Sequence, residues 1–294
     1  MNATGRLGRA VLIGVPSIWL AVFFLLPLLI VLEISVAHGV DAIPPYAPPL
    51  SLSRSGLVLQ ATLANFVDLI RQGCLRAYID SLANAGLATV LCLLLGYPIA
   101  LAIADSAGRR RRLLLFLVIL PFWTSFLIRV YAWMAILQPS GLVNKALLAL
   151  GLVDAPVPLL YNGFSLELGL VYSYLPFMIL PIYGSLSQIE ADLVAAAADL
   201  GARPMRIFWR VILPLSLPGV AAGALLVFIP AVGEFVIPDL LGGPGTLMIG
   251  KVLWAQFFDN RDWPGAAAIA VVLVAGLIPP ILVAQRLVER DRAV

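Results

Sequence analysis

Residues 195–218 read AAAADLGARPMRIFWRVILPLSLP, a strip that combines three arginines, an aspartate, a glycine and three prolines. The chain around it has a very different character. Of its 294 residues, 62% are hydrophobic and only 12% are charged, and the mean hydropathy is +1.01. A soluble domain carries about one charged residue in four, so these few charges cannot cover a water-facing surface. The solvent of this chain is therefore lipid, and the strip is a polar break between spans.

Six segments are apolar enough to cross a membrane as helices. A spanning helix needs about 20 apolar residues, and a backbone in lipid must satisfy its own hydrogen bonds. The sequence therefore predicts an all-α polytopic membrane protein with about six transmembrane helices. The predicted spans are Ala10–Val36, Leu82–Ala104, Leu113–Leu137, Leu166–Leu186, Leu217–Leu240 and Gly265–Ala284.

The distribution of lysine and arginine predicts the orientation, because cytoplasmic loops carry the excess of both. With the N-terminus inside, about twelve basic residues lie on the inner side and about six on the outer side. The inner set includes RRRR at 109–112, which falls in a very short loop. We therefore expect both termini in the cytosol. The first span is longer than the core of a signal peptide, so we expect it to remain as an uncleaved anchor.

Two loops are long enough to carry structure of their own. The outer loop, about residues 37–81, opens with the rigid IPPYAPP and continues as LANFVDLIRQGCLRAYID. The spacing of apolar residues in that second stretch suits a segment on the outer membrane surface. The inner loop, about residues 187–216, contains the strip. Because no tandem repeat divides the chain, we expect one transmembrane domain over residues 1–294.

The inner loop predicts a helix, a glycine and a second helix. DLVAAAADL is strong helix-forming sequence, Gly201 suits a left-handed C-terminal cap, and Pro204 suits the first turn of the next helix. Pro214 and Pro218 are expected to end that helix. Three arginines share one of its faces, with bulky apolar residues beside them: Arg203, Arg206 and Arg210, with Phe208, Trp209 and Ile212. This pattern is typical of a docking surface for a cytosolic partner. The alternative is an amphipathic helix that rests on anionic headgroups.

The strip resembles the EAA loop of ABC-importer permeases, whose pattern is Glu-Ala-Ala, three residues, Gly, then nine residues to Ile-x-Leu-Pro. The matching positions are Ala196, Ala197, Gly201, Val211, Leu213 and Pro214. The family's glutamate falls on Ala195, a departure that removes the salt bridge expected of that residue. By this resemblance, the residues that couple to an ATPase are Ala195, Ala196, Ala197, Asp199, Gly201, Arg203, Arg206, Phe208, Trp209, Arg210, Leu213 and Pro214.

The resemblance covers most of the chain. LPFWTSFLIRVYAWMAIL at 120–137, YSYLPFMILPIYGSL at 172–186 and GEFVIPDLLGGPGTLMIG at 233–250 look like the spermidine/putrescine branch, and more narrowly like the first permease of its heterodimer. The resemblance implies a type I ABC-importer permease in the bacterial inner membrane that works by alternating access. It also implies three kinds of partner: a second permease subunit, two cytosolic ATPases and an extracytoplasmic binding protein. No cofactor is expected in this chain, since ATP and Mg²⁺ would be bound by the ATPase.

Arg129 and Glu234 are charged residues well inside predicted spans, where an ionisable residue is costly and usually functional. Counted from the inner ends of their spans, Arg129 and Glu234 lie at similar depths. They could therefore pair across helices. Alternatively, Glu234 faces the pathway and attracts a cationic substrate, or both side chains snorkel to the interface without a partner.

Five aromatic residues gather on the third and fourth spans: Trp123, Tyr131, Trp133, Tyr172 and Tyr174. They are either interfacial anchors and packing groups or an aromatic pathway that holds ammonium groups. Together with Arg129, Glu234 and Asp239 they form the candidate substrate pathway. Aromatic and acidic groups in combination would suit a polyamine.

Other function classes have less support. An ion-coupled secondary transporter would show inverted repeats and carboxylates near the midplane. A membrane-embedded enzyme needs a catalytic constellation, and His38, Cys74 and Cys92 with scattered acids provide neither that nor a metal site. The chain has no Walker-type loop, so we expect ATP hydrolysis in a separate subunit. Membrane lipid is an expected partner and nucleic acid is not. Within the family, another amine, an amino acid or a phosphonate is the alternative substrate.

Overall fold

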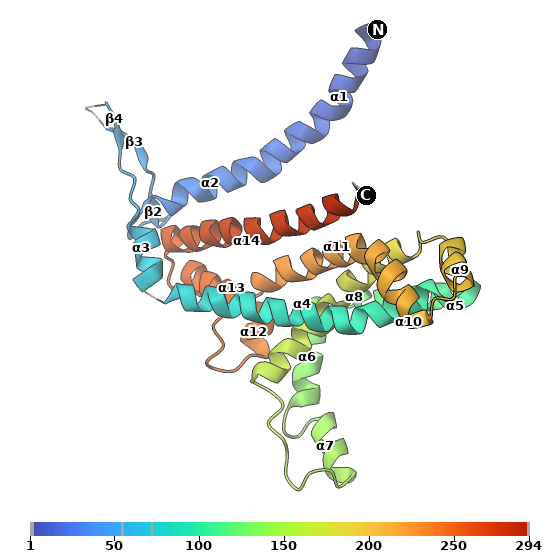
Figure 1. Cartoon of the computed structure of the whole chain (residues 1–294). Helices are drawn as coiled ribbons and strands as arrows, with labels where there is room; N and C mark the ends of the chain where they lie inside the picture. The colour runs from blue at the N-terminus through green and yellow to red at the C-terminus, as the bar shows by residue number, and fades with distance from the viewer. Residues whose placement is uncertain (1–2, 54–55, 72, 293–294) are drawn as a thin grey trace. The chain divides into compact units, whose positions relative to one another are not determined.

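The computed structural model describes residues 3–53, 56–71 and 73–292, most of which are helical (Figure 1). They fall into two compact units. Unit 1 comprises Met1–Leu75 and Val252–Ala275, and unit 2 comprises Arg76–Lys251 and Gly276–Val294. Six helical segments in the described ranges are long and apolar enough to cross a membrane, as the sequence predicts: Leu12–Ser35, Cys74–Ala104, Phe126–Ala149, Gly163–Leu186, Pro204–Val232 and Trp263–Val283.

Unit 1 contains the first helices, two hairpins and the start of the last helix. Its elements are α1 (Ala3–Leu20), the π-helical η1 (Ala21–Leu25), α2 (Leu26–Ser35), β1 (His38–Gly39), β2 (Tyr46–Ala47), β3 (Leu50–Ser53), β4 (Gly56–Leu59), α3 (Ala64–Arg71), the π-helical η4 (Ala255–Asp259) and the first part of α14 (Trp263–Arg292). The hairpins β1–β2 and β3–β4 are antiparallel. No strand was expected in the outer loop, because strands of two to four residues leave too short a pattern to recognise.

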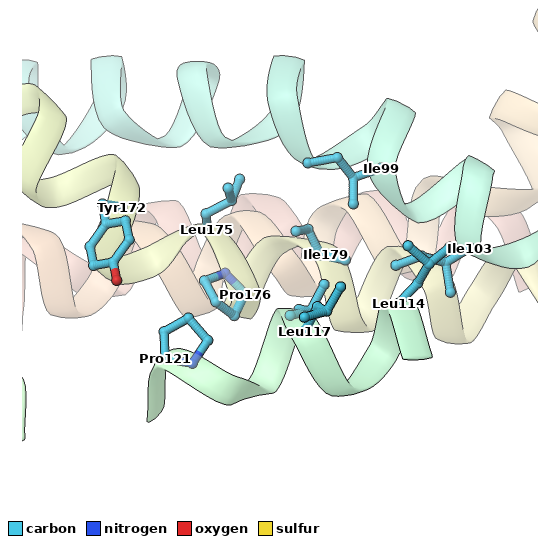
Figure 2. A pocket seen from close by; sticks show the side chains of 10 residues that line it. Ile99, Ile103, Leu114, Leu117, Pro121, Tyr172, Leu175, Pro176 and Ile179 are labelled. Carbon is cyan, nitrogen blue, oxygen red and sulfur yellow. The ribbon is translucent and has the colours of Figure 1, made fainter. Parts of the chain in front are cut away.

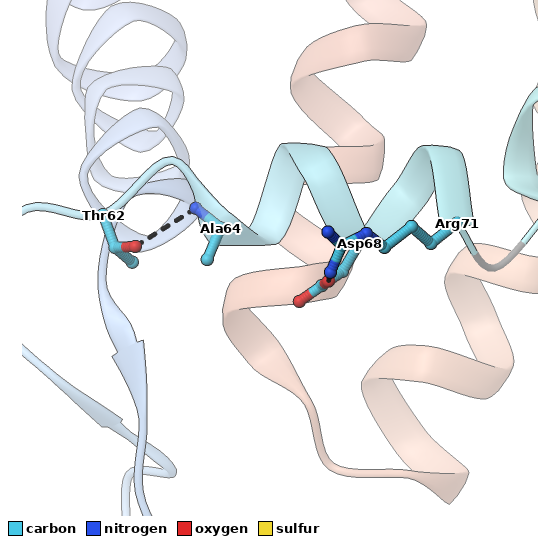
Figure 3. A network of polar contacts seen from close by, with 4 residues as sticks. All are labelled: Thr62, Ala64, Asp68 and Arg71. Atoms are coloured by element: carbon cyan, nitrogen blue, oxygen red, sulfur yellow. Dashed lines mark hydrogen bonds and ion pairs between the residues drawn. The ribbon is translucent and has the colours of Figure 1, made fainter.

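Helix α3 is fixed to the end of α2 by one half-buried amide, that of Asn65. Asn65 Nδ2 donates to the carbonyl oxygens of Ser35 at 2.8 Å and Ala37 at 2.9 Å. At the start of the helix, the Ala64 N–H donates to Thr62 Oγ1 at 3.1 Å (Figure 3). The Asp68–Arg71 ion pair, at 3.8 Å, lies on the exposed side, where such pairs contribute little. The amide of Asn65 therefore does more than the ion pair to place α3.

Unit 2 is built around α8, which packs along α11 and contacts α5, α6 and α12 (Figure 1). Its elements are α4 (Cys74–Ala104), α5 (Gly108–Ile119), the 3₁₀ turn η2 (Leu120–Trp123), α6 (Phe126–Leu137), α7 (Leu142–Ala149), α8 (Gly163–Leu186), α9 (Ala191–Asp199), α10 (Pro204–Ile207), the π-helical η3 (Phe208–Ile212), α11 (Leu213–Val232), α12 (Val236–Leu240) and α13 (Ile249–Trp254). Asn162 caps α8 reciprocally with Ser165, which fixes where this helix starts.

Glycines let α8 and α11 approach closely. A Cβ at Gly219 would lie 2.6 Å from the carbonyl oxygen of Pro181, and a Cβ at Gly223 would lie 2.9 Å from Met178 Sδ. Both glycines are buried. Small residues in this span therefore permit close packing of the two helices.

The third predicted span, Leu113–Leu137, is wrong as one continuous helix. Thr124 and Ser125 have extended backbones, with ψ of 151° and 138°, and they separate η2 from α6. Pro121 lacks an N–H, and Thr124 turns its hydroxyl onto the Pro121 carbonyl at 2.8 Å. This local bond competes with the helical pattern. The spanning segment of the structure is instead Phe126–Ala149, which combines α6 and α7.

The second and fifth predicted spans also have wrong boundaries. Helix α4 begins at Cys74, eight residues before the predicted Leu82, so the outer loop ends earlier than residue 81. Helix α11 ends at Val232 instead of continuing to Leu240. Its end coincides with Gly233, after which Glu234 binds the N–H groups that start α12. A poor helix former followed by a carboxylate that caps the next helix explains the break.

Some of the charges that predict orientation lie outside the part of the chain that the structure describes. Arg54 lies outside the described residues, and so do the side chains of Arg6, Arg9, Arg286, Arg290 and Arg292. The RRRR run is described, and it forms the first turn of α5.

We predict that Gly219→Ala destabilises the subunit by about 1–3 kcal/mol, because the added methyl overlaps the backbone of α8. The matched control is Gly184→Ala in α8, where an added Cβ meets nothing within 4 Å. The control should be neutral or stabilising, since alanine favours helix over glycine. Thermal unfolding of the detergent-solubilised subunit measures both changes. Equal melting temperatures for the two variants would contradict the proposed close contact.

Candidate functional site

The segment 191–214, which contains the polar strip, has the predicted helix–glycine–helix geometry. Gly201 ends α9 with φ of +79°. The Gly201 N–H donates to the Ala198 carbonyl at 2.8 Å, and the Ala202 N–H donates to the Ala197 carbonyl at 3.1 Å. This pair of bonds is the Schellman motif, which satisfies carbonyls at the end of a helix. No atom lies within 4 Å of a Cβ built on Gly201, so the requirement for glycine is one of backbone conformation.

The second helix starts as predicted but does not end where expected. Pro204 occupies the first turn of α10, with Arg203 as the N-cap residue. The helical path then continues through η3 into α11, past both Pro214 and Pro218. The π-helical turn Phe208–Ile212 ends two residues before Pro214, and wider turns of this kind relieve the clash between a proline ring and the preceding turn. The expectation that Pro214 and Pro218 end the element is therefore wrong.

One of the two predicted aromatic anchors points inward. The Phe208 ring packs edge-on against Tyr97 of α4, with centroids 5.7 Å apart. Tyr97 also exchanges a hydrogen bond of 2.8 Å with Ser216. These contacts hold the segment on α4, so Phe208 is a packing residue and not part of an open surface. Sequence periodicity could not reveal this, because the choice of inward face depends on Tyr97.

The remaining surface of the 191–214 segment is both apolar and basic. Trp209 is 59% exposed, and Leu200 and Met205 are 89% and 67% exposed. The arginines 203, 206 and 210 are exposed, as are Ala195, Ala196, Asp199 and Pro214, whereas Ala197 and Leu213 are half-buried. Leu193, Leu200 and Met205 were missed as surface residues, although all three are large apolar side chains in a polar loop. We call Leu193, Leu200, Met205 and Trp209 with the three arginines the exposed cluster.

A second polar site lies where α11 ends, beside the middle of α8. The Tyr174 hydroxyl donates to Glu234 Oε2 at 2.5 Å. Glu234 Oε1 accepts the N–H groups of Phe235 at 3.1 Å and Val236 at 2.9 Å. Tyr174 is buried, whereas Glu234 is half-buried. The carboxylate is thus held by three donors and keeps a partly open side.

Arg129 and Glu234 do not form the direct ion pair that was one of the predicted alternatives. The guanidinium of Arg129 lies over the rings of Phe122 at 5.5 Å and Phe126 at 5.7 Å. Aromatic contacts connect the two charges indirectly, since Phe122 packs against Phe177 at 5.1 Å and Phe177 lies 6.3 Å from Tyr174. Within the described residues, Nε and Nη1 of Arg129 are buried without a hydrogen-bond partner. The possible pairing rested on the equal depths of Arg129 and Glu234 along straight helices. Because the chain breaks at Ser125, α6 does not continue straight from α5, and equal depth does not bring the two side chains into contact.

The other predicted pathway residues occupy separate positions. Trp133 and Tyr172 pack edge-to-face at 5.3 Å. Trp123 is 74% exposed and packs against Phe116, while Tyr131 is 54% exposed. Asp239 of α12 forms an ion pair with Lys251 of α13 at 3.1 Å. The structure therefore brings together Tyr174 and Glu234, and separately Trp133 and Tyr172, but does not gather all of these residues in one site.

One intramembrane carboxylate was missed. Glu167 lies in the first turns of α8, within the predicted span Leu166–Leu186. Both of its carboxylate oxygens are buried, and neither has a hydrogen-bond partner in the described residues. An acid inside an apolar run is itself a sequence signal, so this residue could have been identified. As for metals, no group of three His, Cys, Asp or Glu in the described ranges is arranged to hold an ion.

Comparison with known proteins identifies the family. The profile of the family "Binding-protein-dependent transport system inner membrane component" matches residues 93–292. The spermidine/putrescine transport system permease protein PotB of Haemophilus influenzae is 40% identical over 275 residues, which cover 92% of each chain. The protein of the same name from Escherichia coli K12 is 40% identical over 262 residues, covering 88% of this chain and 91% of its own.

A solved structure agrees on the architecture. A chain in the crystal structure of a bacterial alginate ABC transporter, in complex with alginate pentasaccharide-bound periplasmic protein, matches with a TM-score of 0.74 and 18% identity. The match covers 99% of this chain and 98% of that chain. At this identity the likeness establishes the fold alone, which is that of an ABC-transporter permease. With the profile match and the relatives at 40% identity, the chain belongs to the family of inner-membrane components of binding-protein-dependent transport systems.

Proposed function

We propose that this chain is a permease subunit of an ATP-driven ABC importer that takes up spermidine or putrescine. The observation that carries the proposal is identity of 40% to spermidine/putrescine permeases along nearly the whole chain. The chain is a transport subunit and not an enzyme. Another amine, an amino acid or a phosphonate is the alternative substrate within the same family.

The exposed cluster on the 191–214 segment is the proposed contact for the ATPase. It joins large apolar side chains to three cations, a combination that suits a partner with an apolar cleft and an acidic rim. ATP and Mg²⁺ would be bound by that partner and not by this chain. A second permease subunit and an extracytoplasmic binding protein complete the proposed assembly, as the resemblance implies.

Glu234 is the proposed contact for an ammonium group of the substrate. Its carboxylate is held in place by Tyr174 and two backbone N–H groups, yet the residue remains half-buried instead of fully enclosed. Aromatic rings extend from Tyr174 through Phe177 to Phe122. A cation approaching Arg129 at the far end would be repelled, so the favourable end for a polyamine is the one at Glu234.

We propose that both termini face the cytosol. The family is one of multi-pass inner-membrane proteins, and the excess of arginine and lysine in alternate loops supports this orientation. In this orientation the 191–214 segment lies on the cytosolic side, where an ATPase can reach it.

Trp209→Ala should weaken binding of the ATPase about thirtyfold, because truncating an aromatic anchor in an interface commonly costs about 2 kcal/mol. Trp123→Ala is a matched control, since this tryptophan is also exposed but lies at the end of η2. Co-purification of the ATPase with each variant, followed by a binding titration, measures the difference. Retention of the ATPase by Trp209→Ala as well as by Trp123→Ala would overturn the proposed contact and favour a segment that rests on lipid.

Glu234→Gln should raise the transport KM for spermidine or putrescine about tenfold, because a charge-assisted hydrogen bond is replaced by a neutral one. ATPase co-purification should be unchanged. Tyr172→Phe is the control, since this tyrosine lies on α8, as Tyr174 does, but packs on Trp133 through its ring. Uptake into proteoliposomes gives both parameters. An unchanged KM for Glu234→Gln would overturn the proposed substrate contact and leave Glu234 with a structural role only, at the start of α12.

A reporter that is active only in the cytosol, fused after Val294, should be active if both termini are inside. A second fusion with a reporter active only outside the inner membrane should be silent while being expressed at the same level. A silent cytosolic reporter together with an active external reporter would contradict the proposed orientation. That outcome would leave the proposal about the substrate unchanged.

A further inference from the structure

An apolar groove of about 280 Å³ lies in unit 2 between α4, α5, η2 and α8. Every lining residue except Tyr172 is aliphatic or proline. Ile99 and Ile103 contribute from α4, and Leu114 and Leu117 contribute from α5 (Figure 2). A groove of this composition offers dispersion contacts to hydrocarbon and almost no hydrogen bonds.

The groove runs along α5 and ends beside a group of arginines. Figure 2 shows the lining extending from Pro121 and Tyr172 at one end to Leu114 and Ile103 at the other. One turn beyond Leu114 lies Arg110. From Arg110 to Pro121 the helix rises about 16 Å. This length is close to half of the ~30 Å hydrocarbon thickness of a bilayer, so the distance from Arg110 to the far end of the groove matches the depth of one leaflet.

Arg110 is aligned with the groove by helical periodicity. Residues 110, 114, 117 and 121 are spaced 4, 3 and 4 apart, and therefore share one face of the helical path. Arg109, Arg110 and Arg112 are exposed. Arg111 is committed elsewhere, since its guanidinium donates to the carbonyl oxygens of Ser106 at 2.8 Å and Ala104 at 3.0 Å. Arg110 is thus an exposed cation directly above the groove.

The start of α5 provides a second feature that favours an anion. Its N-cap residue, Ala107, has no side-chain oxygen, and no side chain caps this helix. The first N–H groups of a helix carry partial positive charge and bind phosphate well. Backbone donors and Arg110 therefore lie at the same end of the groove.

We propose that this groove binds one anionic phospholipid, with an acyl chain between α5, α4 and α8 and the phosphate at Arg110 and the first turn of α5. This site is separate from the proposed substrate contact, and its test does not depend on the substrate. A helix of the second permease fits less well, because a helix is 10–12 Å across. A cylinder of that width and about 10 Å in length, the rise from Leu114 to Pro121, far exceeds the volume of the groove, whereas a single acyl chain is narrow enough.

The test uses the purified permease with its co-purifying subunits, stripped of lipid in detergent and titrated with dioleoyl phosphatidylglycerol or dioleoyl phosphatidylcholine. Native mass spectrometry counts the bound lipids. One phosphatidylglycerol should bind in preference to phosphatidylcholine. Arg110→Ala should weaken that binding about fivefold, the effect of one basic residue at an anionic surface. Arg112→Ala is the matched control, because it is exposed on the opposite face of the same turn and should leave the affinity unchanged.

A second measurement identifies what occupies the groove. Leu117→Cys, modified with a benzophenone maleimide, should crosslink to phospholipid on illumination, and labelling should be selective because Cys74 and Cys92 are buried. Crosslinking to the second permease would overturn the proposal and assign the groove to a subunit contact. Equal weakening by Arg110→Ala and Arg112→Ala would also overturn it, since charge would then act without regard to the groove.

Discussion

The close contact of α8 with α11 is the constraint on which the rest of unit 2 depends. Gly219 and Gly223 allow the two backbones to approach so closely that an added methyl group would overlap Pro181 or Met178. This approach sets where α11 ends relative to α8, and therefore places Glu234 within reach of Tyr174. The same helical path extends backward through η3 to Pro204, so Met205 and Trp209 of the exposed cluster lie near one end of this path and the carboxylate of Glu234 lies just beyond the other. In lipid, where helices gain little from hydrophobic burial against each other, such close packing is a main source of association.

Much of the fold follows from the sequence because the membrane imposes a simple rule. Apolar runs of spanning length must be helical, and all six spanning segments overlap their predicted ranges, the first, fourth and sixth to within three residues at each end. Gly201 and Pro204 were also predictable, since a left-handed cap and a proline in the first turn are local requirements. The predictions that were wrong concern places where a side chain competes with the helical backbone for a hydrogen bond. Thr124 bonds the Pro121 carbonyl, and Glu234 bonds the start of α12, and both interrupt spans whose hydropathy is continuous.

The polar sites were less predictable than the spans for a related reason. Hydropathy gives the depth of a residue but not the direction in which its side chain points. Phe208 turns toward Tyr97, and Arg129 lies among phenylalanines instead of beside Glu234. Both outcomes depend on contacts between helices far apart in the sequence. Glu167 is a different case, because an acid inside an apolar run could have been noticed without any structure.

The RRRR run serves both the orientation of the protein in the membrane and the structure of the corner between α4 and α5. These two roles depend on different properties of arginine. Orientation in the membrane depends on the number of positive charges, and lysine would serve as well as arginine. The corner depends on shape, because Arg111 reaches two carbonyl oxygens at once, those of Ala104 and Ser106, where α4 ends. An ammonium group is a compact charge without that fork. A run of four lysines would therefore preserve the orientation in the membrane. The end of α4 would lose the two hydrogen bonds that Arg111 donates to it.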